Sequence, residues 1–469
     1  MRKKRILILC LSFINSLLLT YCAKHPVSEK SDFIRKKKKI SPRQITTPKN
    51  NNLRVTKNTT KKVTKNTPRK VIRNTTKKNI KSILWKTHIK NINTPLAIDD
   101  GFAYIGSKQG LYALDVKTGK IKWNFKTNAW ISSPIVAKTD YGKFVYFSDR
   151  YSLYTFNAKT GKILQKFKST MDKSVKEAFD PNDPDYNSAI KVSILKVNDN
   201  IVYFGNYVNS NGFLYALNAK TGKIKWKLKK NLYFWTPIKI YKKFIYGISY
   251  DFIYAIDKKT GKIKWKFQAN NSVDSLSEFN NNMLYFKSSY GTTYALNAKT
   301  GKVIWKTGYH GDYSTSYPPP SVKNKYIYNQ GTCNIDALNV KTGKMIWKFN
   351  CIDKDLTDVE EFHHNSLVVK GAFAYVGLND NNFYALNAKT GKMIWKFKTS
   401  DRVETKPIIT DNKIYFGSED LHFYALNVTT GRLLWKYKVK CEINSSTINK
   451  NIIYLKDECD NIYAIDIVK

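Results

Sequence analysis

The sequence predicts an all-β protein, a β-propeller of four-stranded blades. One motif, represented by Tyr384-Ala-Leu-Asn-Ala-Lys-Thr-Gly391 and the strand that contains Trp395, recurs in eight variants along the chain. Successive turn glycines are 42, 61, 39, 40, 42, 48 and 40 residues apart. A period of about forty residues is typical of folds that repeat one supersecondary unit. The glycines are Gly119, Gly161, Gly222, Gly261, Gly301, Gly343, Gly391 and Gly431.

Each unit reads as four short strands. Residues 214–218 and 224–228 have strand-like patterns, and the turn 218–222 joins them through an Asn and a Gly. Asn can bond turn amides through its side chain, and Gly can adopt a positive φ without a Cβ clash. Two further candidate strands lie upstream of a hairpin, for example 406–410 and 413–417. Four strands per unit in radial repetition is the propeller pattern.

The two ends of the array complement each other. The chain finishes at 462–466, a third strand without a following hairpin, and the array begins at 83–85, a fourth strand with nothing before it. Their pairing would complete one more blade and remove two open edges. Eight hairpins and one split blade predict nine units over residues 81–469. An eight-bladed ring, with one unit outside the closure, is the alternative.

The tryptophans favour a structural role. A packed aromatic ring buries about 150–250 Å², so a periodic Trp is expected to wedge between neighbouring blades rather than to hold a ligand. Gln165 takes this place in the second unit. The residues at the shared position in the fourth strand are Trp85, Trp123, Trp226, Trp265, Trp305, Trp347, Trp395 and Trp435.

The repeat pattern Ala-x-Asp/Asn-x-x-Thr-Gly-x-x-x-Trp, seen at Ala113, Asp115, Thr118, Gly119 and Trp123, resembles that of pyrroloquinoline-quinone-type propellers. The resemblance extends over residues 81–469. This family includes quinoprotein dehydrogenases and propellers without a cofactor, among them a lipoprotein of the complex that assembles outer-membrane β-barrels. The resemblance therefore implies the fold and leaves the function open.

The N-terminus predicts export. Residues 1–5 are basic and residues 6–21 are mostly apolar, which is typical of a secretory signal and short for a spanning helix. Leu19-Thr-Tyr-Cys22 resembles a lipobox, so residues 1–22 are interpreted as a lipoprotein signal with Cys22 as the lipidated residue. Tyr21 departs from the usual small residue, which keeps ordinary cleavage and an uncleaved anchor as alternatives. By the sorting rules of similar lipoproteins, Ala23 gives no inner-membrane retention cue.

Residues 23–80 are predicted to be a disordered tether rich in Lys, Thr and Asn. Between Lys24 and Lys81, basic residues outnumber acidic ones twenty to two. Such a composition cannot bury enough apolar surface to offset the entropy lost on ordering.

Positive charge is not confined to the tether, since the whole chain carries +46. The hairpins between third and fourth strands of a propeller lie on one face, so their lysines are expected to form a cationic ring, which could attract phosphate- or carboxylate-rich partners. Solvated turns that reflect a Lys-rich composition are favoured over such a binding surface, and no nucleic-acid module is recognisable. The residues are Lys117, Lys120, Lys159, Lys162, Lys220, Lys223, Lys259, Lys262, Lys299, Lys302, Lys341, Lys344, Lys389, Lys392 and Arg432.

Four cysteines follow the signal and suggest two cross-strand disulfides. Cys333 and Cys351 lie symmetrically about a hairpin turn at Thr342, and Cys441 and Cys459 lie symmetrically about a turn at Lys450. Residues equidistant from a hairpin turn face each other, and an exported protein meets oxidising conditions. Metal binding is the weaker alternative, because no Cys-x-x-Cys spacing occurs.

Signals for catalysis are weak. The sequence contains neither a vicinal Cys-Cys pair nor a Cys-x-x-Cys-His haem motif. His363 and His364 beside Glu360 and Glu361 could form a metal or base site, but a structural role at the rim is favoured. The insert 171–187 contains Asp180-Pro-Asn-Asp-Pro-Asp185. A surface loop that docks a partner is favoured there over a Ca²⁺ site.

These observations predict a non-enzymatic scaffold lipoprotein without a cofactor or metal. It would be anchored to the outer membrane through its lipid, face the periplasm, and act as a monomeric propeller within a larger complex. Its expected partners are outer-membrane assembly proteins or another envelope protein, and not nucleic acid. A quinone-dependent oxidoreductase and a propeller that binds glycans or other anionic ligands are the alternatives.

Overall fold

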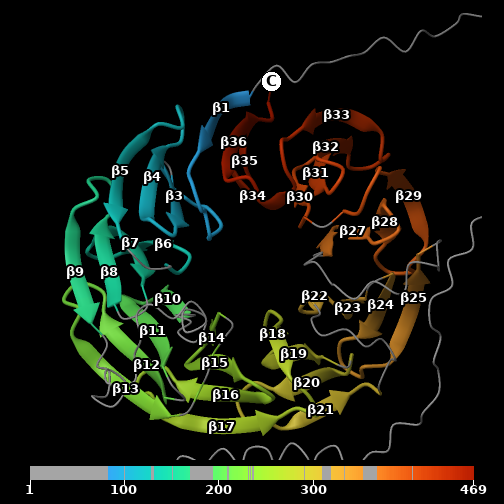
Figure 1. The fold of residues 1–469 in the computed structure, drawn as a ribbon. Coiled ribbons are helices and arrows are strands. Elements are labelled where there is room, and N and C mark those ends of the chain that lie inside the picture. The colour runs from blue at the N-terminus through green and yellow to red at the C-terminus, as the bar shows by residue number, and fades with distance from the viewer. Residues whose placement is uncertain are drawn as a thin grey trace, which may run out of the picture. The chain divides into compact units, whose positions relative to one another are not determined.

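The computed structural model describes residues 83–468 with gaps at 100, 128–130, 150–151, 169–193, 209–210, 231, 233, 235–236, 290, 309–317, 332, 352–366 and 404. In this part of the chain, nine antiparallel four-stranded sheets surround a central opening (Figure 1). The predicted nine-bladed propeller is therefore confirmed, and the eight-bladed alternative is wrong.

Eight blades are continuous in sequence, and each runs from its inner to its outer strand in chain order (Figure 1). Blades 1 to 4 are β2 (Ala97–Ile98), β3 (Phe102–Ser107), β4 (Gly110–Asp115), β5 (Ile121–Lys126); β6 (Ile135–Thr139), β7 (Gly142–Ser148), β8 (Ser152–Asn157), β9 (Ile163–Lys168); β10 (Ile194–Asn198), β11 (Ile201–Val208), β12 (Asn211–Asn218), β13 (Ile224–Lys230); β14 (Lys239–Tyr241), β15 (Phe244–Ser249), β16 (Phe252–Asp257), β17 (Ile263–Gln268).

Blades 5 to 8 have the same plan. They are β18 (Val273–Leu276), β19 (Met283–Ser288), β20 (Thr293–Asn297), β21 (Val303–Lys306); β22 (Ser321–Lys323), β23 (Tyr326–Gln330), β24 (Asn334–Asn339), β25 (Met345–Asn350); β26 (Val368–Lys370), β27 (Phe373–Leu378), β28 (Asn382–Asn387), β29 (Met393–Lys398); β30 (Ile408–Ile409), β31 (Lys413–Ser418), β32 (His422–Asn427), β33 (Leu433–Lys438).

Blade 9 is made from both ends of the propeller. Its strands are β34 (Ile443–Asn449), β35 (Ile452–Asp457), β36 (Asn461–Asp466) and, as the outer strand, β1 (Ile83–His88). Trp85 lies opposite Ala464, as Trp123 lies opposite Ala113 in blade 1. The Asp460 carboxylate accepts hydrogen bonds from the Asn91 and Ile92 amides at 2.6 and 2.8 Å. The chain that leaves β1 is thus held to the turn between β35 and β36.

The middle strands explain why the blades stack around a ring. β15 is buried along its whole length, whereas β5 alternates between exposed and half-buried residues. A strand that is apolar on both faces must be covered on both sides. The core is accordingly a series of clusters between neighbouring sheets, such as the one that joins Tyr246 and Ile248 of blade 4 to Leu284 and Phe286 of blade 5.

A row of three residues crosses nearly every blade. In blade 5, Tyr285 lies opposite Ala295, which lies opposite Trp305. The small Ala lets the Tyr and Trp rings approach above it, with centroids 6.0 Å apart. The same row occurs as Tyr104–Ala113–Trp123, Tyr203–Ala216–Trp226, Tyr246–Ala255–Trp265, Tyr328–Ala337–Trp347, Tyr375–Ala385–Trp395, Tyr415–Ala425–Trp435 and Tyr454–Ala464–Trp85.

The polar atoms of the row reach the next blade. The Trp265 Nε1 donates a hydrogen bond to the Ala298 carbonyl at 3.1 Å, and the Tyr246 hydroxyl donates to the same oxygen at 2.9 Å. Ala298 follows the Asn that opens the Asn-x-x-Thr-Gly turn. Tyr246 and Trp265 therefore pack and remain hydrogen-bonded when buried. Paired donors also meet at Val340 from Tyr285 and Trp305, at Ala388 from Tyr328 and Trp347, and at Val428 from Tyr375 and Trp395.

The turn glycine is required by the same contact. A Cβ on Gly301 would lie 2.7 Å from Trp265 Cδ2, and Gly301 has a φ of +72°. Both the positive φ and the close approach of the indole favour glycine. The Trp position of one blade and the Gly position of the next are thus two halves of one contact, which we call the clasp.

Blade 2 departs from this plan. Its row is Tyr146–Thr155–Gln165, and Gln165 faces the Gly222 turn of blade 3. The Gln165 side-chain amide donates a hydrogen bond to the Lys220 carbonyl. A polar contact therefore replaces the indole at this junction.

The split blade predicts that β1 is needed for stability and that the residues before it are not. Deletion of residues 24–80 is expected to leave the melting temperature nearly unchanged. Deletion of 24–88 exposes an edge of β36 and is expected to lower the melting temperature and promote aggregation. Thermal unfolding followed by circular dichroism and light scattering measures both effects.

Point substitutions in β1 provide the control. We expect Trp85→Ala to lower the free energy of unfolding by about 3–5 kcal/mol. Leu84, whose side chain is 40% exposed, should tolerate Ala with a loss of no more than about 0.5 kcal/mol. Equal melting of the two truncated proteins would contradict the closure by β1.

The raised pKa values of the buried tyrosines predict that the protein loses stability at alkaline pH. Desolvation is the main cause that raises the pKa to about 12 for Tyr146, Tyr203, Tyr285, Tyr328, Tyr375, Tyr415 and Tyr454. An unfolded-state pKa of about 10 is lower, so this contribution to stability is complete below pH 10 and is lost as pH rises toward 12. The free energy of unfolding should fall steeply in that window, with a shallower slope for Tyr285→Phe. Urea unfolding at several pH values measures the slope, and a free energy of unfolding that stays constant between pH 10 and pH 12 would contradict it.

Candidate functional site

Short connections gather basic side chains on one face of the ring. In an antiparallel blade, the turn between strands one and two and the turn between strands three and four lie on the same side, which we call the turn face. The fifteen Lys and Arg residues predicted for the cationic ring lie in or beside the second kind of turn, and all are exposed. The turn face therefore presents a broad positive surface.

The turns that hold these lysines are structurally fixed. The Asn297 side-chain oxygen accepts hydrogen bonds from the Lys299 and Thr300 amides at 3.0 and 3.1 Å. Asp115 does the same for Lys117 and Thr118. Desolvation raises the pKa of Asp115, but these bonds and that from the Thr118 hydroxyl outweigh it and lower the pKa overall. The carboxylate is thus a charged turn anchor.

Several ion pairs on the turn face involve lysines outside the cationic ring. Lys143 pairs with Asp99 at 2.5 Å, and Lys258 pairs with Asp199 at 2.6 Å. Both pairs connect neighbouring blades. They therefore tie neighbouring blades together without the lysines of the cationic ring, of which Lys220 lies over the Tyr141 ring at 5.1 Å.

Carboxylates on the opposite face anchor turns between strands two and three. Asp149 accepts hydrogen bonds from the Ser152 amide and the Tyr154 hydroxyl, both at 2.7 Å. Asp420 accepts one from the Tyr424 hydroxyl at 2.5 Å. This repeated arrangement fixes the turn and its tyrosine, so these acids have a structural explanation.

The two disulfides also lie on the opposite face, at the open ends of hairpins. Cys333 is bonded to Cys351 and Cys441 to Cys459, with Cα atoms 5.2 and 5.7 Å apart. The spacing argument thus paired the four cysteines correctly, and metal coordination by them is excluded.

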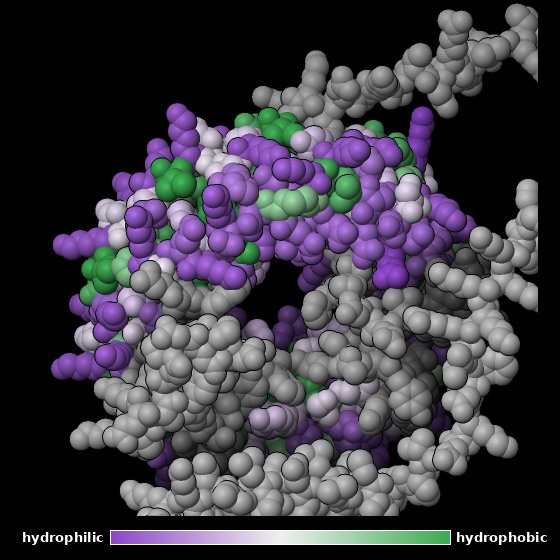
Figure 2. All heavy atoms as spheres, in the orientation of Figure 1, coloured by the Kyte–Doolittle hydropathy of each residue, from purple (hydrophilic) through white to green (hydrophobic). Residues whose placement is uncertain are grey.

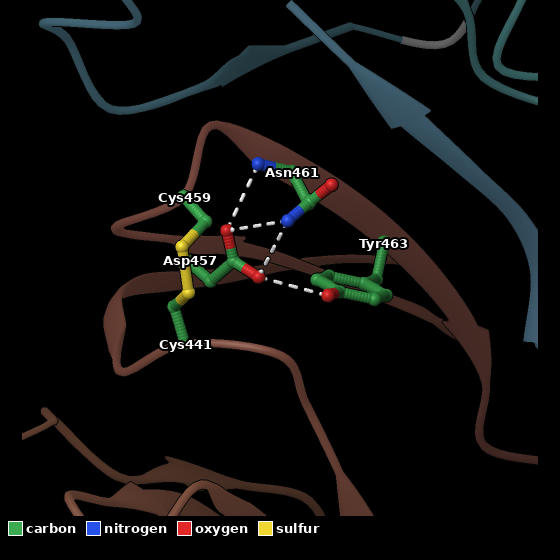
Figure 3. The surroundings of a disulfide bond; sticks show 5 residues. All are labelled: Cys441, Asp457, Cys459, Asn461 and Tyr463. Carbon is green, nitrogen blue, oxygen red and sulfur yellow. Dashed lines mark hydrogen bonds between the residues drawn. A yellow bond between two sulfur atoms is a disulfide. The ribbon is translucent and has the colours of Figure 1, made fainter.

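A buried carboxylate supports the second disulfide. Asp457 is fully buried, and its oxygens accept hydrogen bonds from the Asn461 amide, the Asn461 side chain and the Tyr463 hydroxyl (Figure 3). Cys441–Cys459 lies beside this network (Figure 3). Together they fix the turn before β36, the strand to which β1 must pair.

A cavity of about 310 Å³ lies between blades 8 and 9. Its lining includes Glu419, Glu442, Glu458 and Lys406. A second cavity, of about 200 Å³, is lined by residues between Lys239 and Leu367 and by Lys406. Lys239 and Glu278 are the other charged residues of its described lining. Figure 2 shows a central opening with mainly hydrophilic described side chains above it. These cavities are polar and lie along the inner strands.

Within the described ranges, no group of three or more His, Cys, Asp or Glu residues is arranged to hold a metal ion. No helix in the same ranges has the length and apolar character that a membrane crossing needs. Cys22, the pair His363 and His364 with its neighbouring glutamates, and the acidic insert 171–187 lie outside the described residues.

The tryptophan positions were chosen from the sequence, but the tyrosines of the rows were missed. The signal was present, because each second strand contains a Tyr two residues after its first large residue, as in Phe102-Ala-Tyr104 and Phe373-Ala-Tyr375. The strands pair this Tyr with the Ala of the repeat motif.

Two family models match the chain. One, described as outer membrane protein assembly factor BamB, matches residues 245–355 and 331–468. The other, described as the β-propeller domain of glucose/ethanol/alcohol dehydrogenase, matches residues 73–233. No curated protein sequence matches the chain.

Three solved structures resemble the propeller at low sequence identity. BamB from Moraxella catarrhalis is 16% identical, with a TM-score of 0.49 and coverage of 82% of this chain and 99% of that one. The computationally designed Ika8 protein is 13% identical, with a TM-score of 0.50 and coverage of 81% and 98%. A europium-containing methanol dehydrogenase is 14% identical, with a TM-score of 0.51 and coverage of 80% and 84%.

At these identities the structural likeness shows the fold and not the activity. The two family models, however, match different parts of the ring, residues 245–468 and 73–233. In both parts the chain is therefore similar to pyrroloquinoline-quinone-type repeat β-propellers.

Proposed function

We propose that the protein is a non-enzymatic scaffold of the cell envelope that binds protein partners. The observation that carries this proposal is the turn face, where structural turns on a closed ring present exposed lysines over a wide surface. A rigid frame with exposed loops is suited to docking. The match of residues 245–468 to the model of an outer-membrane assembly factor supports the same role.

The proposal includes the location and the class of partner. Cys22 is the proposed lipidation site, which would anchor the chain to the outer membrane with the propeller in the periplasm. Residues 23–80 would act as the tether. The proposed partners are proteins that assemble the outer membrane, or another envelope protein, and the propeller would act as one subunit of a larger complex.

Quinone-dependent oxidation is the second candidate, because residues 73–233 match a dehydrogenase propeller model. The quinone is a flat molecule with three carboxylates, so it needs both cationic groups and a flat apolar surface. Lys239 and Lys406, which line the cavity of about 200 Å³, could bind carboxylates. Tyr328 is the one aromatic residue among the described lining, and its hydroxyl donates to the Ala388 carbonyl at 3.1 Å. The described cavity therefore does not fit the quinone.

The first functional prediction concerns the anchor. Wild-type protein in its native cells should incorporate a labelled fatty acid and fractionate with membranes, whereas Cys22→Ala should do neither. Crosslinking followed by affinity capture should recover an envelope assembly protein with the wild type. A wild-type chain that remains unlabelled and soluble, or that crosslinks to no envelope protein, would contradict the proposal.

The second prediction separates scaffold from enzyme. Purified propeller incubated with pyrroloquinoline quinone and Ca²⁺ should show neither stoichiometric binding of the chromophore nor oxidation of alcohols or sugars with an artificial acceptor. Equilibrium dialysis measures the binding independently of turnover. Stoichiometric binding together with turnover would favour the oxidoreductase.

A further inference from the structure

A cleft opens on the turn face between blades 4 and 5. Its volume is about 360 Å³. The aromatic residues Tyr241, Phe244 and Tyr246 line it, and three lysines, Lys242, Lys243 and Lys299, belong to the same lining. The cleft is distinct from the two polar cavities of the inner strands.

The aromatic wall is built across the two blades. The Tyr241 ring stacks on Phe279 of blade 5 with centroids 4.5 Å apart and planes 7° apart, and Phe279 contacts Tyr246 at 4.6 Å. Tyr246 is fully buried and its hydroxyl is bonded to the Ala298 carbonyl, so it supports the wall from beneath, while half-buried Tyr241 is the ring within reach of a ligand. The wall is therefore rigid and apolar.

This wall is specific to one junction of the described ring. Tyr241 pairs with Phe244 where the first strand meets the second. At that position of the first strand, the other eight blades have polar side chains. These are Asp99, Thr139, Asn198, Asn280, Lys323, Lys370, Thr410 and Asn449.

The lysines are held at the cleft by the rings themselves. The Lys242 Nζ lies 5.5 Å from the Tyr241 ring centroid, and the Lys243 Nζ lies 5.5 Å from that of Phe244. Lys242 Nζ also donates a hydrogen bond to the Asn282 side chain. No Asp or Glu is among the described residues that line the cleft. Its ammonium groups thus lack a carboxylate within the cleft.

We propose that this cleft binds an aromatic or aliphatic side chain of a partner protein, in a segment where carboxylates flank that side chain. The apolar wall favours an apolar group, and the lysines provide charge complementarity for the neighbouring acids. The chain's own N-terminal residues are strongly basic, so they have the wrong charge to fill it. This inference rests on the proposed scaffold function and specifies the chemistry of its partner.

Labelled peptides test the specificity of the cleft. Fluorescence anisotropy with the intact propeller would compare three peptides: Asp-Glu-Phe-Glu-Asp, the same peptide with Ala for Phe, and a peptide with Lys for every acid. We expect the first to bind, the Ala peptide to bind about tenfold more weakly, and the basic peptide not to bind. Equal binding of the Phe and Ala peptides, or no binding of either, would overturn the proposal.

A pair of matched substitutions locates the binding. Lys243→Glu changes the cleft, whereas Lys325→Glu changes the equivalent exposed turn position of blade 6. We expect Lys243→Glu to weaken binding of the Phe peptide by about tenfold and Lys325→Glu to leave it unchanged. Tyr241→Ser should remove the preference for Phe over Ala. Thermal unfolding of each variant verifies the fold, and equal losses from both lysine variants would show general attraction to the face and overturn the proposal.

A membrane-surface role gives a different result. Phosphatidylglycerol vesicles that bind in a Lys243-dependent manner and are not displaced by the Phe peptide would overturn the peptide assignment. Failure of the cleft is also separable from failure of the scaffold function. If Lys243→Glu and Tyr241→Ser capture the same envelope protein as the wild type, the scaffold stands and the cleft does not; if the wild type captures none, the scaffold itself fails.

Discussion

The clasp between a tryptophan and the following turn is the interaction on which the ring depends. Trp265 contacts Gly301 through its ring face and the Ala298 carbonyl through its Nε1. The indole therefore removes apolar surface from water and satisfies a buried donor in the same contact. Because one partner belongs to each blade, this interaction fixes the angle between blades as well as their separation. The ring follows from repetition of that angle.

Closure places a special demand on blade 9. Elsewhere the third and fourth strands are joined by a tight turn, but β36 and β1 come from opposite ends of the propeller. The turn before β36 is braced by Cys441–Cys459 and by the buried Asp457 network. Asp460 in the same turn binds the chain after β1. These contacts replace, at one blade, the local connection that sequence continuity provides at the others.

The sequence predicts the fold well because the repeat motif contains both residues of the clasp, the turn Gly and the Trp. The Gly and Trp positions gave the number of blades, and hairpin symmetry paired Cys333 with Cys351. The tyrosines of the rows were harder to recognise, because the chain contains 31 tyrosines and those in second strands lack a turn motif beside them. The cleft could not be predicted, since Tyr241 and Phe279 meet only through the packing of two separate blades. The function is harder to predict than the fold, because a lysine-rich turn has the same sequence pattern whether it faces water or a partner protein.

Gln165, which takes the place of the shared Trp, makes one joint of the described ring different from the others. A ring of identical joints would respond in the same way to a force applied at any blade, since each joint has the same stiffness. At the junction of blades 2 and 3, a flexible amide side chain contacts Gly222 in place of a planar indole. Hydrogen bonds join the two blades there, from Gln165 to the Lys220 carbonyl and between Asp140 and Asn200. Water and salt can compete for such contacts more readily than for a buried indole, so this joint is the one at which solution conditions should act most directly on the described ring.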